Sequence, residues 1–431
     1  MDSEVDSDIN RTDLDHFIGT YFDGNIKFVP DANNGNHYID NCIAYKNAFT
    51  FGSEAKCSLG ETYCSFDIKD ILWKDWADDS ELQKYPFKWV KKPLQVLIQS
   101  EKERGLSHKL FIQTLVALQV LNIKHAAEKL MKGSIRVALF TVRTDYRIRQ
   151  RAILSDVSRI AGFERVHLIT EITAATVAYV IDKNRDSLTK EIIMVFSLDH
   201  AHCDCSIIKV SNTSIEYISH DSETVDELLN VRSQESGILI AIIGDYINNQ
   251  LSLKGLRKED LSKILVIGHS DRLTEFKNHI IEHFSSKRIL YDCNPKDIVA
   301  IGTAYFGQIL ENRLDIVVIE DIIKMGIKMY LHMNDGRPKQ HELMGQNVSV
   351  QEYFKSKEIE IKVHKNNFPI AMTILEDINH QKKILNELDM NKGAAVVTSN
   401  MNGSVAKLPP LWRIILESAQ KGTVIKSGCG D

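Results

Sequence analysis

The sequence predicts a mixed α/β protein: α/β lobes followed by a smaller β-rich domain. Between about residues 106 and 310, apolar runs with strand character alternate with segments of helical spacing, which favours α/β lobes over an all-helical protein. From about Leu314, short apolar runs alternate with Asn-, Gly- and Lys-rich turns, as is typical of a small β domain. The length of 431 residues is enough for two or three domains.

Composition and charge exclude several classes of protein. Hydrophobic residues make up 43% of the chain, and the net charge of −5 gives no global reason to expect nucleic acid or an anionic membrane as a partner. The seven scattered cysteines fit free thiols in a reducing compartment. The acidic start differs from a signal peptide, and no apolar run approaches the roughly 20 residues that span a bilayer. We expect a cytoplasmic or nuclear location.

The first elements are short strands and one long helix. Residues 17–28 predict two strands joined at Asp23 and Gly24, because Asp-Gly between apolar runs is a strong hairpin signal. A further strand is expected at 41–45. Apolar residues recur at helical spacing from 106 to 132, so a long helix is expected there, ended by Gly133.

Alternating strands and helices follow. The expected strands are 135–142, 165–169, 192–198, 205–210, 215–219 and 264–267, and the expected helices are 147–160, 174–182, 235–247 and 297–310. Gly162 stops the helix 147–160, and residues 200–204 form a tight segment between two strands. In the β-rich region, the apolar runs are 315–319, 322–332, 359–363 and 394–397.

Five segments, in the same order, resemble the heat-shock protein 70 family over nearly the whole chain. They are YFDGNIKFVPDANNG (21–35), FGSEAK (51–56), RQRAILSDVSRIAGFERVHLITEITAATVAYVID (149–182), LVIGHSDRLTEF (265–276) and NPKDIVAIGTAYFGQIL (294–310). The pattern of losses resembles the divergent, ribosome-linked branch of the family. The resemblance implies a two-lobed actin-like (ribonuclease H-like) ATPase fold with part of the second lobe missing.

In this sequence, the two segments that match the phosphate-binding hairpins of the family lack the glycines. Glycine lets backbone N–H groups approach a triphosphate closely. The first hairpin pattern falls on residues 8–14, where both glycines are absent and Asn10 replaces a carboxylate. The second falls on residues 197–204, where three glycines are absent, Ser197 replaces the metal-side aspartate and Asp204 remains.

Some site positions of the family are kept in this sequence, and the resemblance assigns a role to each of them. Lys69 falls on the phosphate-facing lysine, Glu171 on the glutamate that orients the attacking water, and Asp204 completes the catalytic set. Gly268, Ser270 and Arg272 fall on adenosine-facing positions. From the residues alone, Lys69 and Arg272 are equally well surface side chains, and Glu171 a capping carboxylate at a helix N-terminus.

A nucleotide would also lose one wall of its pocket. Only about 60 residues separate Asp204 from Gly268, roughly half of what the family uses there, and the missing part supplies the adenine clamp. The resemblance implies ATP or ADP with Mg²⁺ as cofactor, but these losses make ATP hydrolysis an unfavoured prediction. The coupling elements differ too, since Arg143 and Ile172 stand at family prolines while Arg151 is kept.

The resemblance divides the chain into three parts. Residues 1–312 form a degenerate nucleotide-binding-type domain, 313–321 an interdomain linker, and 322–431 a reduced β-sandwich of the substrate-binding type without a helical lid. Ile327, Met329 and Val348 are candidates for lining a peptide cleft, although core positions are the favoured interpretation.

One local cluster carries metal-ligand side chains but predicts no metal site. His200, His202, Cys203 and Cys205 lie within six residues. In a strand the histidines share one face and the cysteines the other, so a site of four ligands from these residues alone is awkward.

The residues leave two functions open. The first is a chaperone or co-chaperone in protein folding and the stress response, which acts on unfolded or nascent polypeptides with a J-domain co-chaperone and with weak or absent ATP binding and hydrolysis. The second is a nucleotide-independent pseudo-ATPase scaffold that binds chaperone or ribosome partners. A small-molecule kinase on the same fold is disfavoured, because it needs the same phosphate loops.

Overall fold

The computed structural model divides into two compact units, Met1–Val142 with Gln150–Val318, and Arg143–Arg149 with Ile319–Asp431. The residues that it describes are 16–17, 19–22, 25–31, 33–40, 42–45, 48–57, 63–66, 88–91, 94–99, 107–144, 146, 148–183, 190–198, 202–211, 214–224, 236–268, 273–286, 289–295, 297–311, 318–319, 322–323, 326–333, 339–344, 348–349, 357–363, 369–378, 381–389, 412–418 and 424–426. Among these residues, no helix is both long and apolar enough to cross a membrane.

The N-terminal hairpin is confirmed. β2 (Gly19–Phe22) pairs antiparallel with β3 (Asn25–Phe28), and Phe22 stands opposite Asn25; the Asp-Gly pair between them lies outside the described residues. The expected strand at 41–45 is β5 (Cys42–Tyr45), between β6 (Phe49–Phe51) and β7 (Tyr63–Phe66). The short strands β1 (His16–Phe17) and β4 (Tyr38–Ile39) pair with each other.

The loop that follows β3 is anchored to the start of helix α1 (Gly52–Cys57) by Asp31. Its carboxylate accepts the Ser53 backbone N–H at 3.0 Å and the Ser53 hydroxyl at 2.7 Å. Gly52 has φ +63°, and a Cβ there would stand 2.6 Å from the Asp31 carboxylate. Thus two of the family-like segments, 21–35 and 51–56, meet in one buried contact.

The long helix starts later than expected. Residues 107–111 are a strand, β10 (Ser107–Phe111), which pairs with β9 (Leu94–Gln99), itself paired with β8 (Lys88–Lys91). Helix α3 covers Ile112–Met131, and the left-handed residue at its end is Lys132 (φ 52°) rather than Gly133. Strand pairing wins here because the apolar spacing of residues 106–111 fits either structure.

The β–α–β unit is confirmed. β11 (Val137–Val142) runs parallel to β12 (Arg165–Thr170), joined through helix α4 (Ile148–Ile160). Gly162 takes φ +77° just after α4. Helices α3 and α4 share one apolar cluster. Helix α5 (Glu171–Asp182) follows β12 without a loop and starts three residues before the expected position.

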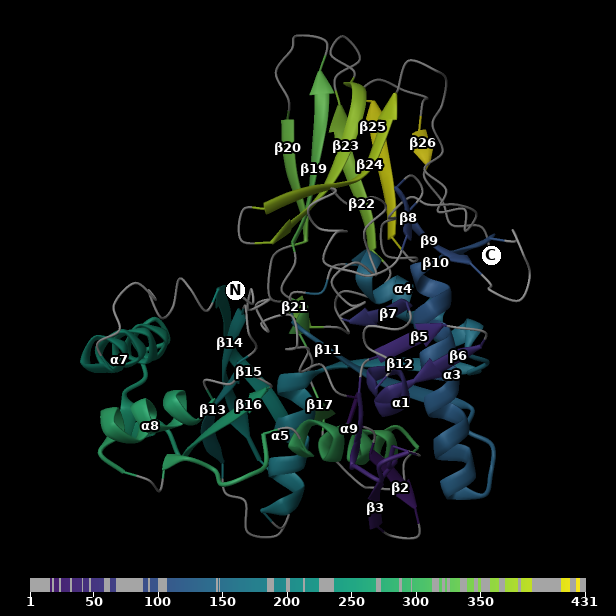
Figure 1. Cartoon of the computed structure of the whole chain (residues 1–431). Coiled ribbons are helices and arrows are strands. Elements are labelled where there is room, and N and C mark those ends of the chain that lie inside the picture. Colours follow the sequence, from purple (N-terminus) through teal and green to yellow (C-terminus); the bar gives the residue numbers. More distant parts are fainter. Residues whose placement is uncertain are drawn as a thin grey trace, which may run out of the picture. The chain divides into compact units, whose positions relative to one another are not determined.

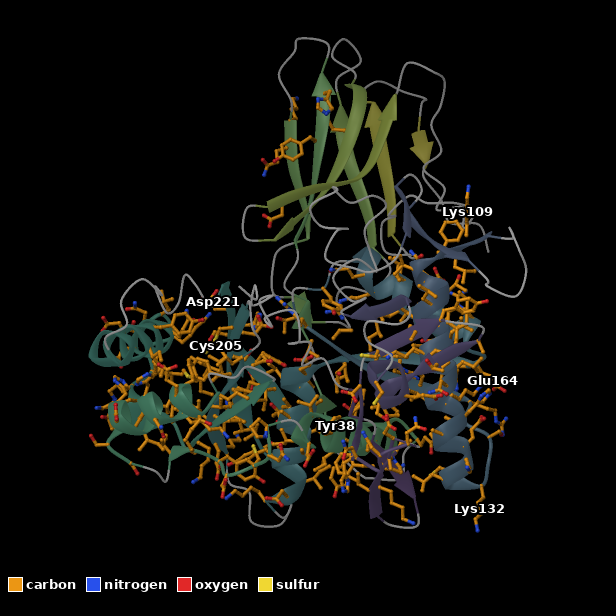
Figure 2. The ribbon with its side chains drawn as sticks, in the orientation of Figure 1. Tyr38, Lys109, Lys132, Glu164, Cys205 and Asp221 are labelled. Carbon is orange, nitrogen blue, oxygen red and sulfur yellow. The ribbon has the colours of Figure 1, made fainter. Side chains whose placement is uncertain are left out.

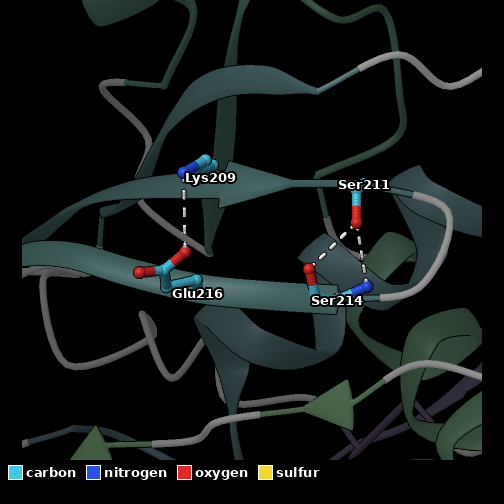
Figure 3. Close-up of polar contacts among 4 residues, drawn as sticks. All are labelled: Lys209, Ser211, Ser214 and Glu216. Atoms are coloured by element: carbon cyan, nitrogen blue, oxygen red, sulfur yellow. Dashed lines mark hydrogen bonds and ion pairs between the residues drawn. The ribbon is translucent and has the colours of Figure 1, made fainter.

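A five-stranded sheet has the order β16-β13-β14-β15-β17 (Figure 1). Its strands are β13 (Glu191–Leu198), β14 (His202–Val210), β15 (Ser214–Thr224), β16 (Lys263–Gly268) and β17 (Val318–Ile319). Neighbours β13 to β15 are antiparallel, whereas β13 and β16 are parallel. At the β14–β15 turn, the hydroxyls of Ser211 and Ser214 bond at 2.9 Å, and the ion pair Lys209–Glu216 spans the hairpin (Figure 3).

One face of this sheet packs on α7 (Ser236–Ser252) and α8 (Leu273–Phe284). The 3-10 turn η3 (Lys258–Asp260) lies between these two helices in the sequence. The expected helix 235–247 therefore extends five residues further. Asp221 of β15, opposite Cys205 of β14 and labelled with it in Figure 2, accepts hydrogen bonds from Tyr246 (3.3 Å) and Gln250 (2.8 Å) of α7.

Helix α5 is buried and packs on α9 (Asp297–Leu310), the helix whose bounds match the expectation to the residue (Figure 1). Residues 172–180 of α5 are all buried. At the crossing, Gly302 of α9 lies against the main chain of Ala174. Only a residue without a side chain fits there.

The second unit confirms the expected β-rich texture, since its described elements after Ile319 are strands. β20 (Lys339–Met344), β19 (Gly326–Met333), β23 (Pro369–Ile378) and β24 (Gln381–Asp389) form one sheet in this order. β22 (Lys357–Val363), β25 (Trp412–Ser418) and β26 (Val424–Lys426) form another, and β18 (Ile322–Ile323) pairs with β21 (Val348–Ser349). The run 394–397 lies outside the described residues. The predicted boundaries at 312 and 321 stay a prediction.

Candidate functional site

Two of the six predicted site residues, Glu171 and Asp204, lie next to Ser197 where α5 begins, and a third, Gly268, lies at the end of the neighbouring strand β16. Ser197 stands opposite Asp204 in the register of β13 and β14, and Leu198 stands beside Gly268 in the register of β13 and β16. Residues opposite each other in a sheet share a face. Glu171, the first residue of α5, reaches the same point through a contact with Ser197.

Glu171 is bound by Ser197, and the N-cap of its helix is the residue before it. The Ser197 hydroxyl donates a hydrogen bond to Oε2 of Glu171 at 3.2 Å. The cap is Thr170, whose hydroxyl accepts the backbone N–H of Thr173 at 3.2 Å. Ser197, predicted to replace a metal-side aspartate of the family, therefore bonds directly to Glu171, the predicted water-orienting glutamate.

Asp204 and Gly268 are both fixed by their strands. Asp204 is only 4% exposed, and Ser197 opposite it is 7% exposed. Gly268 has φ +114°, and a Cβ there would stand 2.1 Å from the carbonyl oxygen of Leu198. The close approach of the two backbones at the end of β16 is therefore enough to require glycine at residue 268, with or without a bound ligand.

The described part of this site offers Mg²⁺ two carboxylates, Glu171 and Asp204, of which Glu171 already accepts a hydrogen bond from Ser197. Hard divalent cations take oxygen ligands, above all carboxylates. Ser197, which the sequence predicts to replace a metal-side aspartate, donates its hydroxyl to Glu171, and Asp204 is buried opposite it. Lys69, Ser270 and Arg272 lie outside the described residues, as do residues 8–14 and 199–201, so their predicted roles remain predictions.

Tyr217 is a site residue that the sequence did not reveal. On β15, its hydroxyl lies 2.5 Å from Oγ1 of Thr173 and 3.4 Å from Oγ1 of Thr170. Thr170 also donates to Thr173 at 2.8 Å, so three hydroxyls form one network at the start of α5. The threonines could have been found as a capping pattern before a helix; Tyr217, 44 residues from Thr173, had no local signal.

The cysteines of the 200–205 cluster belong to the core. Cys203 and Cys205 are 0% and 2% exposed and pack with α7 and α8. His200 lies outside the described residues, and His202 is described only in its backbone. Across the described ranges, no group of three or more His, Cys, Asp or Glu side chains is placed to hold a metal ion.

The coupling and cleft candidates are placed only in part. Arg151 of α4 is 7% exposed and Ile172 of α5 is 1% exposed, so both are interior residues. Ile327 and Met329 lie on β19 and Val348 on β21, with their side chains outside the described residues.

Helix α7 follows β15 after a short connection in the second lobe. Eleven residues, 225–235, join the end of β15 to the start of α7, and α7 then packs on the sheet through Asp221 and the apolar cluster.

Comparisons with known proteins give consistent results. A family model described as "Hsp70 protein" matches residues 15–225 and 237–377, and its gap falls on the connection between β15 and α7. The chain is 24% identical over 213 residues to the "Heat shock 70 kDa protein 2" of Paracoccidioides lutzii. That match covers 48% of this chain and 32% of the relative's length.

Proposed function

The chain belongs to the heat-shock protein 70 family, which brings with it the actin-like fold, and on this premise we propose that it is a chaperone or co-chaperone of that class. In this proposal it assists the folding of unfolded or nascent polypeptides, with weak or absent ATP binding and hydrolysis. The observation that carries the proposal is the extent of the family match, which continues beyond residue 319 into the β-rich unit up to residue 377.

The chemistry of the site supports the weak nucleotide dependence. Binding a triphosphate needs backbone N–H groups exposed by glycines and a metal held by carboxylates. Ser197 donates a hydrogen bond to the carboxylate of Glu171. Ser197 itself is at the position that we predict to carry an aspartate in the family. ATP or ADP with Mg²⁺, the cofactor normal for the family, is therefore proposed to bind weakly or not at all.

Calorimetric titration of the full chain with Mg-ATP tests this part. We expect no measurable heat at high protein concentration. Micromolar affinity together with ATP-dependent release of a bound peptide would contradict it and would place the protein among ATP-driven chaperones.

The proposed partners follow from the family. They are unfolded or nascent polypeptides, a J-domain co-chaperone and the ribosome, in the cytoplasm and nucleus. The chaperone assay is suppression of aggregation when a denatured client is diluted into buffer with the full chain, without nucleotide. We expect suppression at equimolar ratio, with an equal amount of serum albumin as control.

A nucleotide-independent scaffold is the second candidate, favoured by the same Ser197–Glu171 contact. It binds chaperone or ribosome partners but no clients. Absence of aggregation suppression, combined with co-sedimentation with ribosomes or stable binding to a J-domain protein, would select the scaffold over the chaperone.

A further inference from the structure

Helix α5 is tied at both ends to the same strand, β13. At its N-terminal end Glu171 accepts from Ser197, the next-to-last residue of β13. At its C-terminal end the Tyr179 hydroxyl donates to Glu191, the first residue of β13, at 2.6 Å. The helix and the strand therefore run antiparallel, and neither can slide along the other without breaking a hydrogen bond at each end.

Two further contacts fix the helix from other directions. Tyr217 of β15 binds both Thr170 and Thr173 at the first turn. At the last turn, the Tyr291 hydroxyl donates to Asp182, and the rings of Tyr179 and Tyr291 meet edge to face with centroids 4.9 Å apart. Together with β13, Tyr217 and Tyr291 make three separate parts of the chain that hold α5.

Helix α5 is also continuous with the sheet formed by β11 and β12. Thr170 is at once the last residue of β12 and the N-cap of α5, so no loop absorbs movement between the β11–β12 sheet and the helix. In the middle of α5, Gly302 interlocks with Ala174. Such close backbone packing resists sliding, because packed interiors deform in discrete steps.

From these contacts we propose that α5 holds the β11–β12 sheet and the β13–β17 sheet in one fixed arrangement without any bound nucleotide, through its hydrogen bonds to Ser197, Tyr217 and Glu191. This inference rests on the proposed weak nucleotide dependence and extends it. The Ser197–Glu171 contact stands where a metal-side aspartate is expected, so the site serves as a structural tie.

Hydrogen exchange of the full chain, followed by mass spectrometry of peptides, tests the tie. In the parent protein we expect the same exchange in α5, β12 and β13 with and without millimolar Mg-ATP. The double variant Ser197→Ala, Tyr217→Phe should exchange roughly tenfold faster in α5, β12 and β13 together, because the two sheets separate as units.

The matched control is Ser214→Ala, Tyr246→Phe. It removes one serine and one tyrosine hydroxyl from the same lobe, where Ser214 bonds Ser211 in the β14–β15 turn and Tyr246 bonds Asp221 on the opposite face (Figure 3 shows Ser214). Faster exchange confined to the first turn of α5, or exchange no faster than in the control, would overturn the inference. So would slower exchange in the parent protein on addition of Mg-ATP.

If the double variant does not fold, Tyr217→Phe against Tyr246→Phe decides the same question, together with the Mg-ATP arm on the parent protein. The chaperone assay is independent of this result. A parent protein that fails to suppress aggregation contradicts the proposed function, whereas the exchange pattern alone decides whether the sheets are tied.

Discussion

Gly302 on α9 lies so close to the main chain of Ala174 on α5 that a Cβ at residue 302 would stand 1.7 Å from the Ala174 carbonyl oxygen. The obstructing atom is backbone, so it cannot rotate away. Both helices are buried at the crossing, and separating them would open the core on either side.

The first prediction concerns this crossing. Gly302→Ala should lower the free energy of unfolding by about 3 kcal/mol or more, as overpacking of a rigid site does. Gly307→Ala on the same helix is the control, since its Cβ would meet only Leu139 at an ordinary 3.7 Å and alanine favours helix. Urea unfolding of both variants gives the comparison; equal stabilities would refute the interlock.

The second prediction concerns restoring the family carboxylate. Ser197→Asp places an anion beside Glu171 and opposite Asp204, and it removes the hydroxyl that donates to Glu171. We expect a lower melting temperature and still no binding of Mg-ATP, because the missing glycines are not restored. Ser197→Asn controls for size without charge. Tight Mg-ATP binding by Ser197→Asp would show that a single carboxylate limits the site.

The third prediction concerns Asp31. Burial alone would raise the pKa of its carboxyl, but hydrogen bonds from Ser53 and from the Asn33 and Asn34 backbones outweigh burial and lower the pKa below 3.8. The ionised form therefore stabilises the fold above that pH, and this stability is lost as pH falls through the lowered pKa.

Asp31→Asn should cost about 2 kcal/mol at neutral pH, because it removes the charge from several hydrogen bonds. Its unfolding free energy should also depend less on pH in the acid range. Asp156→Asn is the control, since its side chain is 61% exposed in a surface ion pair with Arg159. An equal effect of both substitutions, measured by urea unfolding across acid pH, would contradict the anchoring role.

The fourth prediction concerns His283, whose ring packs against Gly244 of α7. Burial, with a smaller effect of Lys258 and against that of Asp245, lowers the pKa of His283 below its ordinary value of 6.5. The unfolded chain then takes up the proton first, so stability is full above pH 6.5 and falls as pH drops below it.

His283→Phe keeps a ring at this position and removes its titration. Its melting temperature should change less than that of the parent protein between about pH 7.5 and pH 5.5, the range in which histidine titrates. His125→Gln, at an exposed position of α3, is the control and should leave the parent's pH dependence in place. A parent curve that is already flat over this range would refute the prediction.

Local signals predicted the elements whose ends have a chemical marker. The helix after Asn294 and Pro295 was predicted to the residue, and the Asp-Gly hairpin was placed correctly. Where a marker was not used, the boundary was wrong: α5 begins at Glu171, three residues before the expected start, because Thr170 caps it. Residues 107–111 became a strand because pairing with β9 overrode their helical spacing.

Only those site residues that stand in a local sequence motif were predicted. Glu171, Asp204 and Gly268 were identified by motif; sheet register places Asp204 opposite Ser197 and Gly268 beside Leu198, and Glu171 accepts a hydrogen bond from Ser197. The contact between Ser197 and Glu171 could not be foreseen, because it depends on how α5 crosses the sheet. Tyr217 was missed for the same reason, since its partners are defined by tertiary packing alone.

The ties of α5 also set the order in which this chain can fold during its own synthesis. Residues 172–180 are interior positions, yet Asp182 meets its partner Tyr291 only after 109 more residues have been added. Contacts of such long sequence separation form late. Until α9 has been synthesised, the largely apolar residues 172–180 lack part of their cover and are open to aggregation, so this chain is itself expected to need a chaperone while it is made.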